Sequence, residues 1–264
     1  MARQFFIIAI LCFCVSVKAQ MAANIVDINA CPNKTISLSI HVILDTADLA
    51  MVTPIQVNAS IATLNQNFKP MCVQFKVCNY DSVPENIYFE KTAQDYLTEL
   101  TTKYNIPNTI NIYYSATVSP MWGSLDQSRG LATSANDNVR MANPLFRDFI
   151  LVSYDDISII THLMGHYFGL YDTFNNTVPE LANGSNCKVA GDSICDTEAD
   201  PGTFNANMVN CHLTSPTQDA NGEYYTPPVC NHMSFYPAGC VKYFTPEQFN
   251  RMLSIFYTKR KYLW

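Results

Sequence analysis

The sequence has few charged residues, and the charge that it carries is mostly negative. Lysine and arginine number 16 in 264 residues, against 22 aspartates and glutamates, which gives a net charge of -6. A protein that holds a nucleic-acid backbone needs a positive patch or stripe to neutralise phosphates. The composition therefore argues against nucleic acid as a partner.

Long apolar runs are also scarce. The run from Phe5 to Val15 follows Arg3 and leads to small residues suited to cleavage after Ala19. It is shorter than the roughly 20 apolar residues that a transmembrane helix needs. We therefore predict that residues 1–19 are a secretory signal peptide and that residues 20–264 form a single secreted, extracellular domain without a membrane span.

The cysteines lack the C-x-x-C spacing that is typical of cysteine-rich zinc sites. Of the ten cysteines, Cys12 and Cys14 fall in the predicted signal peptide. The eight that remain are Cys31, Cys72, Cys78, Cys187, Cys195, Cys211, Cys230 and Cys240. An even set in a secreted chain indicates disulfides, but eight cysteines allow about 105 pairings, so the spacing leaves the connectivity open.

Apolar periodicity predicts alternating strands and helices over much of the chain. Strands are expected at Thr35–Leu44, Cys72–Cys78, Thr109–Tyr114 and Phe149–Ser153. Helices are expected at Pro54–Phe68, Lys91–Tyr104 and Thr245–Tyr257. The first helix should pack through Ile55, Ile61, Leu64 and Phe68. Residues 119–143 lack periodicity and are expected to be loop or edge strand, and residues 173–239 are expected to be held by bridges more than by regular elements.

One segment carries the pattern of a metal site. Thr161 to Asp172 reads T-H-L-M-G-H-Y-F-G-L-Y-D, with His162 and His166 four residues apart at helical apolar spacing. Both imidazoles should project from one helix face, and Asp155 or Asp156 is expected to cap this helix. Gly169 would end it and let the backbone return, which brings Asp172 to the same point as a third ligand. An ordinary turn aspartate is the alternative for this residue.

Four motifs together resemble the pappalysin and cytophagalysin family of secreted zinc metallopeptidases. They are the histidine segment, G-D-S-I-C-D-T-E-A-D-P at 191–201, C-N-H-M-S-F-Y-P-A-G-C at 230–240 and F-T-P-E-Q at 244–248. The resemblance extends over roughly 35–257. It implies a metzincin-like α+β fold, in which a twisted mixed sheet with packing helices forms an upper sub-domain (about 31–170). A smaller, irregular, disulfide-rich lower sub-domain (about 171–264) would follow, with a cleft for a protein or peptide between the two.

The same resemblance gives roles to single residues and exposes two departures. Met233 would lie in a methionine turn beneath a zinc ion held by His162, His166 and Asp172. Where the family has the glutamate that serves as general base, this chain has Leu163, which cannot accept a proton. Where the family has a tyrosine that stabilises the tetrahedral intermediate, this chain has Phe235, so we assign no catalytic residue.

Other candidates are weaker because they lack partner spacing. His41 lies within a predicted strand, where a satisfied core histidine is commoner than a ligand, while His212 and His232 are alternative metal ligands. Tyr236, next to Phe235, is an alternative oxyanion donor. Acidic side chains at three positions are candidates for calcium or, equally, for capping turns: Asp192, Asp196 and Asp200. We expect a bridge between Cys211 and Cys240, which flank the methionine turn.

Three functional hypotheses follow from these residues. The first, which we prefer, is a zinc-binding homologue of the family that has lost most peptide hydrolysis, a pseudoenzyme that binds proteins or peptides. The second is an active zinc endopeptidase with a substitute base. The third is a secreted domain without metal. Leu163 favours the first, because an apolar residue at the position of the base suits a helix that only packs.

Overall fold

The structure is a computed structural model that describes residues 31–44, 47, 49–84, 93–115, 130–133, 148–175, 177–202, 208–237 and 239–264. The predicted signal peptide and most of residues 119–143 lie outside these ranges.

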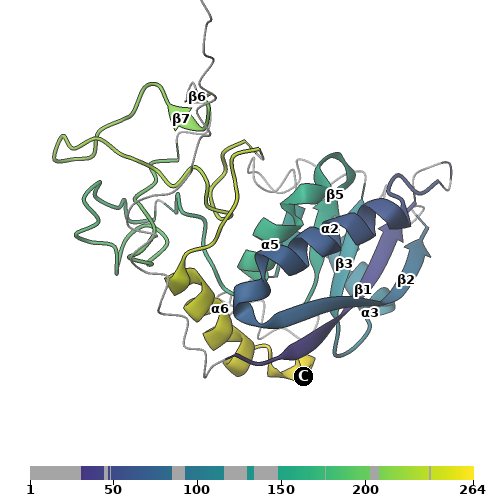
Figure 1. Cartoon of the computed structure of the whole chain (residues 1–264). Coiled ribbons are helices and arrows are strands. Elements are labelled where there is room, and N and C mark those ends of the chain that lie inside the picture. The colour runs from purple at the N-terminus through teal and green to yellow at the C-terminus, as the bar shows by residue number, and fades with distance from the viewer. Residues whose placement is uncertain are drawn as a thin grey trace, which may run out of the picture.

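A five-stranded mixed sheet forms the framework of residues 31–170, here called the upper part, which lie on the right in Figure 1, while residues 171–264 are called the lower part. Its strands are β1 (Lys34–Ile43), β2 (Val73–Val83), β3 (Ile110–Ser115), β4 (Gly130–Ala132) and β5 (Ile150–Ser153). The spatial order is β2-β1-β3-β5-β4, and all neighbours are parallel except β4, which runs antiparallel to β5 at the edge. Four predicted strands are therefore confirmed, and the edge-strand expectation for residues 119–143 holds at β4.

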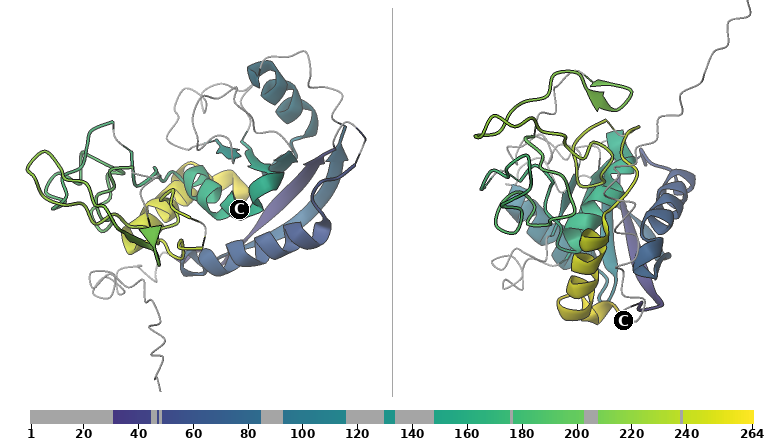
Figure 2. Two further views of the ribbon diagram at one scale, coloured as in Figure 1. Left: turned by 90° about the horizontal axis from the view of Figure 1, so that it is seen from above. Right: turned by 60° about the vertical axis from the view of Figure 1, so that its left-hand side comes forward.

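Helices cover both faces of this sheet, which explains why its central strands are apolar almost throughout. On one face α2 (Pro54–Asn67) and α5 (Ile160–Tyr167) pack on alternate strand residues such as Ile112 and Ile150. On the other face α3 (Ala93–Tyr104) packs on the residues between them, such as Tyr113 (Figure 2). The sheet and α2 therefore fix the position of α5.

Two details of the predicted helices are wrong. Ile55 was expected to pack, but it is 81% exposed, and Val57 takes its place in the core. The cause is the N-terminal cap: Thr53 and Gln56 form a capping box, so Ile55 falls in a first turn that faces solvent. Neither Asp155 nor Asp156 caps α5, because a 3-10 helix, η6 (Tyr154–Ile159), leads into it and Ser153 caps that element instead.

The lower part contains little regular structure among its described residues. It holds the short strands β6 (Met208–Val209) and β7 (His212–Leu213), then α6 (Pro246–Thr258) and η7 (Lys261–Leu263). A further 3-10 helix, η2 (Lys69–Met71), follows α2 in the upper part. The helix α6 begins at a capping box made by Thr245 and Gln248, as its sequence predicts. None of the helices in the described ranges is long and apolar enough to cross a membrane.

Disulfides close three loops among the described residues. Cys31 and Cys72 join the starts of β1 and β2, Cys187 pairs with Cys195, and Cys211 pairs with Cys240 as expected. The expectation that every cysteine after the signal peptide is bridged is wrong at Cys78, an exposed free thiol on β2. Among the described strands, β2 pairs with β1 alone and forms the edge of the sheet opposite β4.

Candidate metal centre

The helix α5 presents both histidines at one end of the sheet. Its C-terminus lies at Tyr167, and Gly169 then takes a left-handed conformation with φ 83°. The Gly169 amide donates to the His166 carbonyl at 2.8 Å, and Leu170 donates to the Gly165 carbonyl at 3.0 Å. This turn reverses the chain, as the glycine predicts, and carries Asp172 back toward the histidines.

Three side chains converge at this point. Nε2 of His162 lies 3.2 Å from Oδ1 of Asp172, and Nε2 of His166 lies 3.3 Å from the same oxygen. The two imidazole rings are 4.5 Å apart and nearly perpendicular. Within the described ranges, this is the group of histidine, cysteine or acidic side chains with the spacing to hold a metal ion.

The other nitrogen of each ring identifies the tautomer. Nδ1 of His162 lies 2.8 Å from the carbonyl oxygen of His232, and Nδ1 of His166 lies 2.9 Å from that of Leu170. A carbonyl only accepts hydrogen bonds, so each Nδ1 carries the proton. In a neutral ring Nε2 then presents a lone pair, and both lone pairs face the Asp172 carboxylate.

This donor set fits a zinc ion. Three electron-pair donors that face one another repel unless a proton or a cation lies between them. A tetrahedral ion with ligand bonds of about 2.0 Å separates its ligands by roughly 3.3 Å, which agrees with the 3.2 Å and 3.3 Å between the two Nε2 atoms and Oδ1 of Asp172. Burial by itself raises the pKa of Asp172; if a proton takes the place of the cation on the imidazoles, the charges and hydrogen bonds of His166 and His162 outweigh burial and lower that pKa below its ordinary range.

At the position of the family's general base, the side chain of Leu163 packs in the core. Leu163 is 2% exposed and belongs to the core that α5 shares with the sheet. A Cβ on Gly130 of β4 would come within 2.3 Å of Leu163 Cδ1 and 2.8 Å of the Leu151 carbonyl. A glycine on the edge strand therefore makes room for the leucine. Sequence reasoning missed Gly130, because only the pairing of β4 with β5 brings it to α5.

The oxyanion position also lacks a polar group. The Phe235 ring lies 6.3 Å from the His162 ring and 6.1 Å from that of Phe174, so it borders the site with apolar surface. The hydroxyl of Tyr236 donates to Oδ1 of Asp200 at 3.1 Å and is buried. Because the Tyr236 hydroxyl already donates to Asp200, Tyr236 is a poor substitute for the missing oxyanion donor.

The methionine turn lies directly under α5. Met233 is fully buried, and a Cβ on Gly165 would come within 2.4 Å of its sulfur, so Gly165 admits the close approach. Asn231 accepts a hydrogen bond from the Met233 amide and exchanges two side-chain hydrogen bonds with Gln248. The turn is thus fixed to the start of α6. Among these positioning residues, only Gln248 could be identified from the sequence, because it belongs to the T-P-E-Q motif.

The remaining histidines do not join the group. His41 is fully buried and satisfied by Asp81 at 2.7 Å and Asn111 at 3.0 Å, in agreement with the core interpretation. His212 lies exposed on β7. His232 contributes its backbone carbonyl, while its ring packs on Phe244 at 4.8 Å. Burial, with the nearby His162, lowers the pKa of His232 to about 4.

The three aspartates considered for calcium have separate roles. Asp192 accepts from the Ile194 amide and the Thr197 hydroxyl, and Asp196 accepts from the Glu247 amide at the start of α6. Asp200 accepts from Thr173, Tyr236 and the Gly202 amide. They form no cluster with metal-ligand spacing among the described residues. The capping alternative describes these contacts, and calcium stays a prediction without a ligand set.

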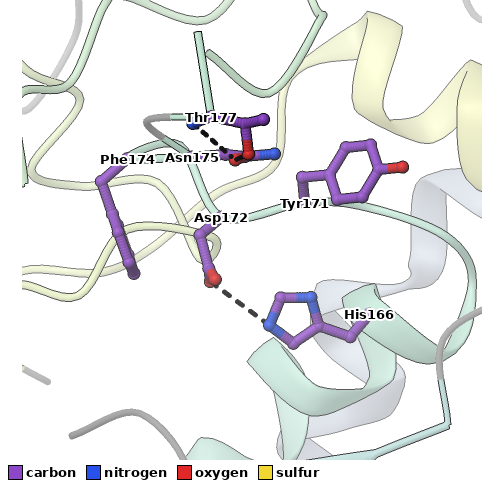
Figure 3. A pocket seen from close by; sticks show the side chains of 6 residues that line it. All are labelled: His166, Tyr171, Asp172, Phe174, Asn175 and Thr177. Carbon is purple, nitrogen blue, oxygen red and sulfur yellow. Dashed lines mark hydrogen bonds and ion pairs between the residues drawn. The ribbon is translucent and has the colours of Figure 1, made fainter. Parts of the chain in front are cut away.

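A cavity of about 410 Å³ opens beside the site. Its lining consists of His166, Tyr171, Asp172, Phe174, Asn175 and Thr177 (Figure 3). The volume is in the range of pockets that hold small ligands or single side chains of a peptide. Two aromatic rings and two metal-ligand candidates thus share one opening.

Comparison with known proteins agrees with this geometry. The family model of pregnancy-associated plasma protein-A, Peptidase_M43, matches residues 131–256, which contain α5, the methionine turn and most of α6. An extracellular metalloprotease of Colletotrichum graminicola is 22% identical over 240 residues, which cover 89% of this chain and 80% of the relative. An extracellular metalloprotease of Verticillium alfalfae is 27% identical over 223 residues, which cover 77% and 75%.

A solved structure shares the fold. Mirolysin, determined in complex with compound 9, superposes with a TM-score of 0.58 at 18% sequence identity, and the match covers 87% of this chain and 95% of mirolysin. The mixed sheet, the helices on both faces and the irregular lower part therefore belong to a known architecture, as the sequence motifs predicted.

Proposed function

Because this chain carries a metallopeptidase domain of the pappalysin (Peptidase_M43) family, we propose that it is an extracellular zinc-binding protein that holds peptide segments in its cleft and hydrolyses them poorly or not at all. The observation that carries this proposal is a complete set of three ligand candidates next to a base position filled by Leu163.

Zinc is the metal that suits the residues present. His162, His166 and Asp172 would hold it, with the histidine tautomers fixed by the carbonyls of His232 and Leu170. A zinc ion bound there supplies a Lewis acid that polarises a carbonyl oxygen. The family implies a metal cofactor in general terms, and the choice of zinc and of these ligands is our proposal.

The chain's own residues do not support efficient hydrolysis. Attack of water on a peptide carbonyl requires a group that accepts a proton, and Leu163 has none. The developing negative charge requires a donor, and Phe235 presents only carbon. General-base help is worth about 10² to 10⁴ in rate, and one oxyanion donor about 10² to 10³. A chain that lacks both the general base and the oxyanion donor would mainly bind peptides and position them.

The extracellular location fits the chemistry of the chain. Relatives of the chain are named extracellular metalloproteases, and disulfides persist in oxidising compartments. The three bridges therefore agree with secretion.

The test is a panel of fluorogenic peptides with and without chelator. The wild type should show little or no cleavage, and Leu163→Glu should gain chelator-sensitive cleavage of about 10²-fold, because the glutamate supplies a proton acceptor. Leu163→Gln is the matched control, since it places a similar polar group against Gly130 without basicity. Adding Phe235→Tyr to Leu163→Glu should raise the rate by up to about 10² more.

Two outcomes contradict the proposal. Strong chelator-sensitive cleavage by the wild type would establish the alternative of an active endopeptidase with a substitute base. Equal activity of the Glu and Gln variants, in folded protein that contains zinc, would show that position 163 does not control proton transfer.

A further inference from the structure

One potential modification site lies inside the cleft. The sequence contains four N-x-S/T sequons, at Asn33, Asn58, Asn175 and Asn183. Three of these asparagines are exposed away from the cavity, but Asn175 is half-buried and lines the same cavity as His166 and Asp172. In Figure 3 the Asn175 and Thr177 side chains lie on the side of the cavity opposite His166, with Asp172 between them.

The turn after Asp172 fixes the orientation of this asparagine. The Asn175 amide donates to the Asp172 carbonyl at 3.1 Å, so the sequon is tied to the third ligand candidate. The side-chain oxygen of Asn175 accepts from the Thr177 hydroxyl at 2.9 Å and from the Thr177 amide at 3.3 Å. These bonds occupy the oxygen, and the side-chain nitrogen, Nδ2, has no hydrogen-bond partner among the described residues.

Nδ2 is the atom to which an N-linked sugar is attached. We propose that Asn175 carries an N-linked glycan and that this glycan covers the cavity beside His166 and Asp172. In the reaction, Nδ2 attacks the anomeric carbon of a polyprenyl-diphosphate-linked oligosaccharide. A carbon–nitrogen bond forms, the carbon–oxygen bond to the diphosphate breaks, the amide loses one proton, and polyprenyl diphosphate leaves.

The consequence concerns which partners reach the cleft. A glycan is bulky and hydrated, and at Asn175 it begins three residues beyond Asp172, at the rim of the 410 Å³ cavity. It would exclude the face of a folded protein while it leaves room for a flexible peptide end. This inference rests on the proposed function, because it selects among ligands of the same cleft.

The modification is tested by peptide mapping of the full chain secreted from eukaryotic cells. Release of the glycan by an N-glycosidase in heavy-oxygen water converts a modified asparagine to labelled aspartate. Asn175 is expected to carry the label, Thr177→Ala should abolish it, and Thr177→Ser should retain it because serine preserves the sequon. An unlabelled Asn175 in the secreted wild type overturns the proposal, and this result does not depend on zinc.

The covering role is tested with zinc-loaded protein and one hydroxamate-tipped peptide, used free or linked to a folded carrier protein. The ratio of the free to the carrier-linked association rate should fall by roughly tenfold in Asn175→Gln, because the sugar no longer obstructs the carrier. Asn58→Gln, which removes a sequon on α2, is the control and should leave the ratio as in the wild type. An unchanged ratio in Asn175→Gln overturns the covering role. Absence of binding by wild type and variant alike overturns the zinc proposal and leaves the mapping result to decide the modification.

Discussion

At the scale of single residues, the histidine pair shows how backbone groups prepare side chains for a metal. His162 and His166 each donate from Nδ1 to a carbonyl, one from the methionine turn and one from the turn that follows α5. These two turns belong to different parts of the chain, yet they impose the same tautomer on both rings. The two turns therefore orient both Nε2 atoms toward Asp172.

Asp172 is the ligand candidate with the clearest alternative, an ordinary turn aspartate. We predict that Asp172→Ala weakens zinc binding by at least roughly 10²-fold, because it removes a charged ligand atom that both Nε2 atoms face. Competition with a chromogenic zinc chelator measures the affinity, and elemental analysis gives the stoichiometry. His166→Ala should have a similar effect, and Asp219→Asn, at an exposed turn of the lower part, is the control. Loss with His166→Ala but not with Asp172→Ala would assign Asp172 to the turn alone.

Glu180 is a second residue whose burial has a measurable consequence. It is 4% exposed, and its carboxylate occupies the space that a Cβ on Gly191 would fill. Burial, together with the negative charge of Asp192, raises the pKa of Glu180 to about 7, and burial raises that of Asp192 to about 7. The folded state therefore retains protons that the unfolded chain loses near pH 4 to 5, so this contribution to stability is lost as the pH rises through about 7.

We predict that Glu180→Gln stabilises the protein at pH 8 by on the order of 1 kcal/mol and changes stability little at pH 5. The neutral amide replaces a carboxylate that is ionised only at the higher pH. Urea unfolding of wild type and variant at several pH values in this range gives the difference in their unfolding free energies. The contributions of Asp172 and His232 are the same in both proteins and cancel in that difference. A difference that is the same at pH 5 and pH 8 would contradict the assignment.

At the scale of elements, α5 is held at its C-terminal end by a residue near the end of the chain. Arg260 is fully buried, and its guanidinium donates to the carbonyls of Tyr167 and Thr133 at 2.9 to 3.2 Å. It also pairs with Asp148 and lies 3.8 Å from the centre of the Tyr167 ring. Tyr167 directly follows His166, so Arg260 joins the histidine helix to the edge strand β4.

We predict that Arg260→Lys lowers the free energy of unfolding by about 3 kcal/mol and also weakens zinc binding. Lysine keeps the charge, but it cannot satisfy two carbonyls and a carboxylate with one planar fork. Arg251→Lys, at a half-buried arginine of α6, is the matched control and should cost less. The readouts are urea unfolding and chelator competition. A zinc affinity equal to that of the wild type in folded Arg260→Lys would restrict the role of this arginine to stability.

At the scale of the whole molecule, the two parts are stabilised by different means. Buried apolar residues from the sheet, α2 and α5 form one large core in the upper part, and α6 of the lower part packs against it. Besides α6 and η7, the described lower part has two short strands and two disulfides, and it supplies Asp172 and the methionine turn to the site. The methionine turn therefore lies inside the loop that the Cys211–Cys240 disulfide closes.

We predict that replacing Cys211 and Cys240 by serine lowers stability by about 3 to 4 kcal/mol, since the bridge spans 29 residues and its loss releases the unfolded chain. The same change should weaken zinc binding, because Cys240 lies near the methionine turn. Replacing Cys187 and Cys195, which are 8 residues apart, should cost about 2.5 kcal/mol and serves as the control. Unfolding curves and chelator competition measure both effects, and an equal loss of zinc affinity in the two variants would contradict a specific link to the turn.

The sequence by itself determined what depends on local chemistry. Helical spacing placed His162 and His166 on one face, Gly169 predicted the reversal that returns Asp172, and Thr245 with Gln248 predicted the start of α6. These features need only neighbouring residues, because helix period, glycine conformation and capping act within a turn of the chain.

Only the tertiary structure decided which distant residues meet. Gly130 lies beside Leu163 because β4 pairs with β5, Gly165 lies above Met233 because the lower part folds under α5, and Arg260 reaches Tyr167 from the end of the chain. The exposed free thiol of Cys78 likewise lies on β2, at the edge of the sheet. Such contacts join residues that are far apart in sequence, so local sequence patterns cannot predict them.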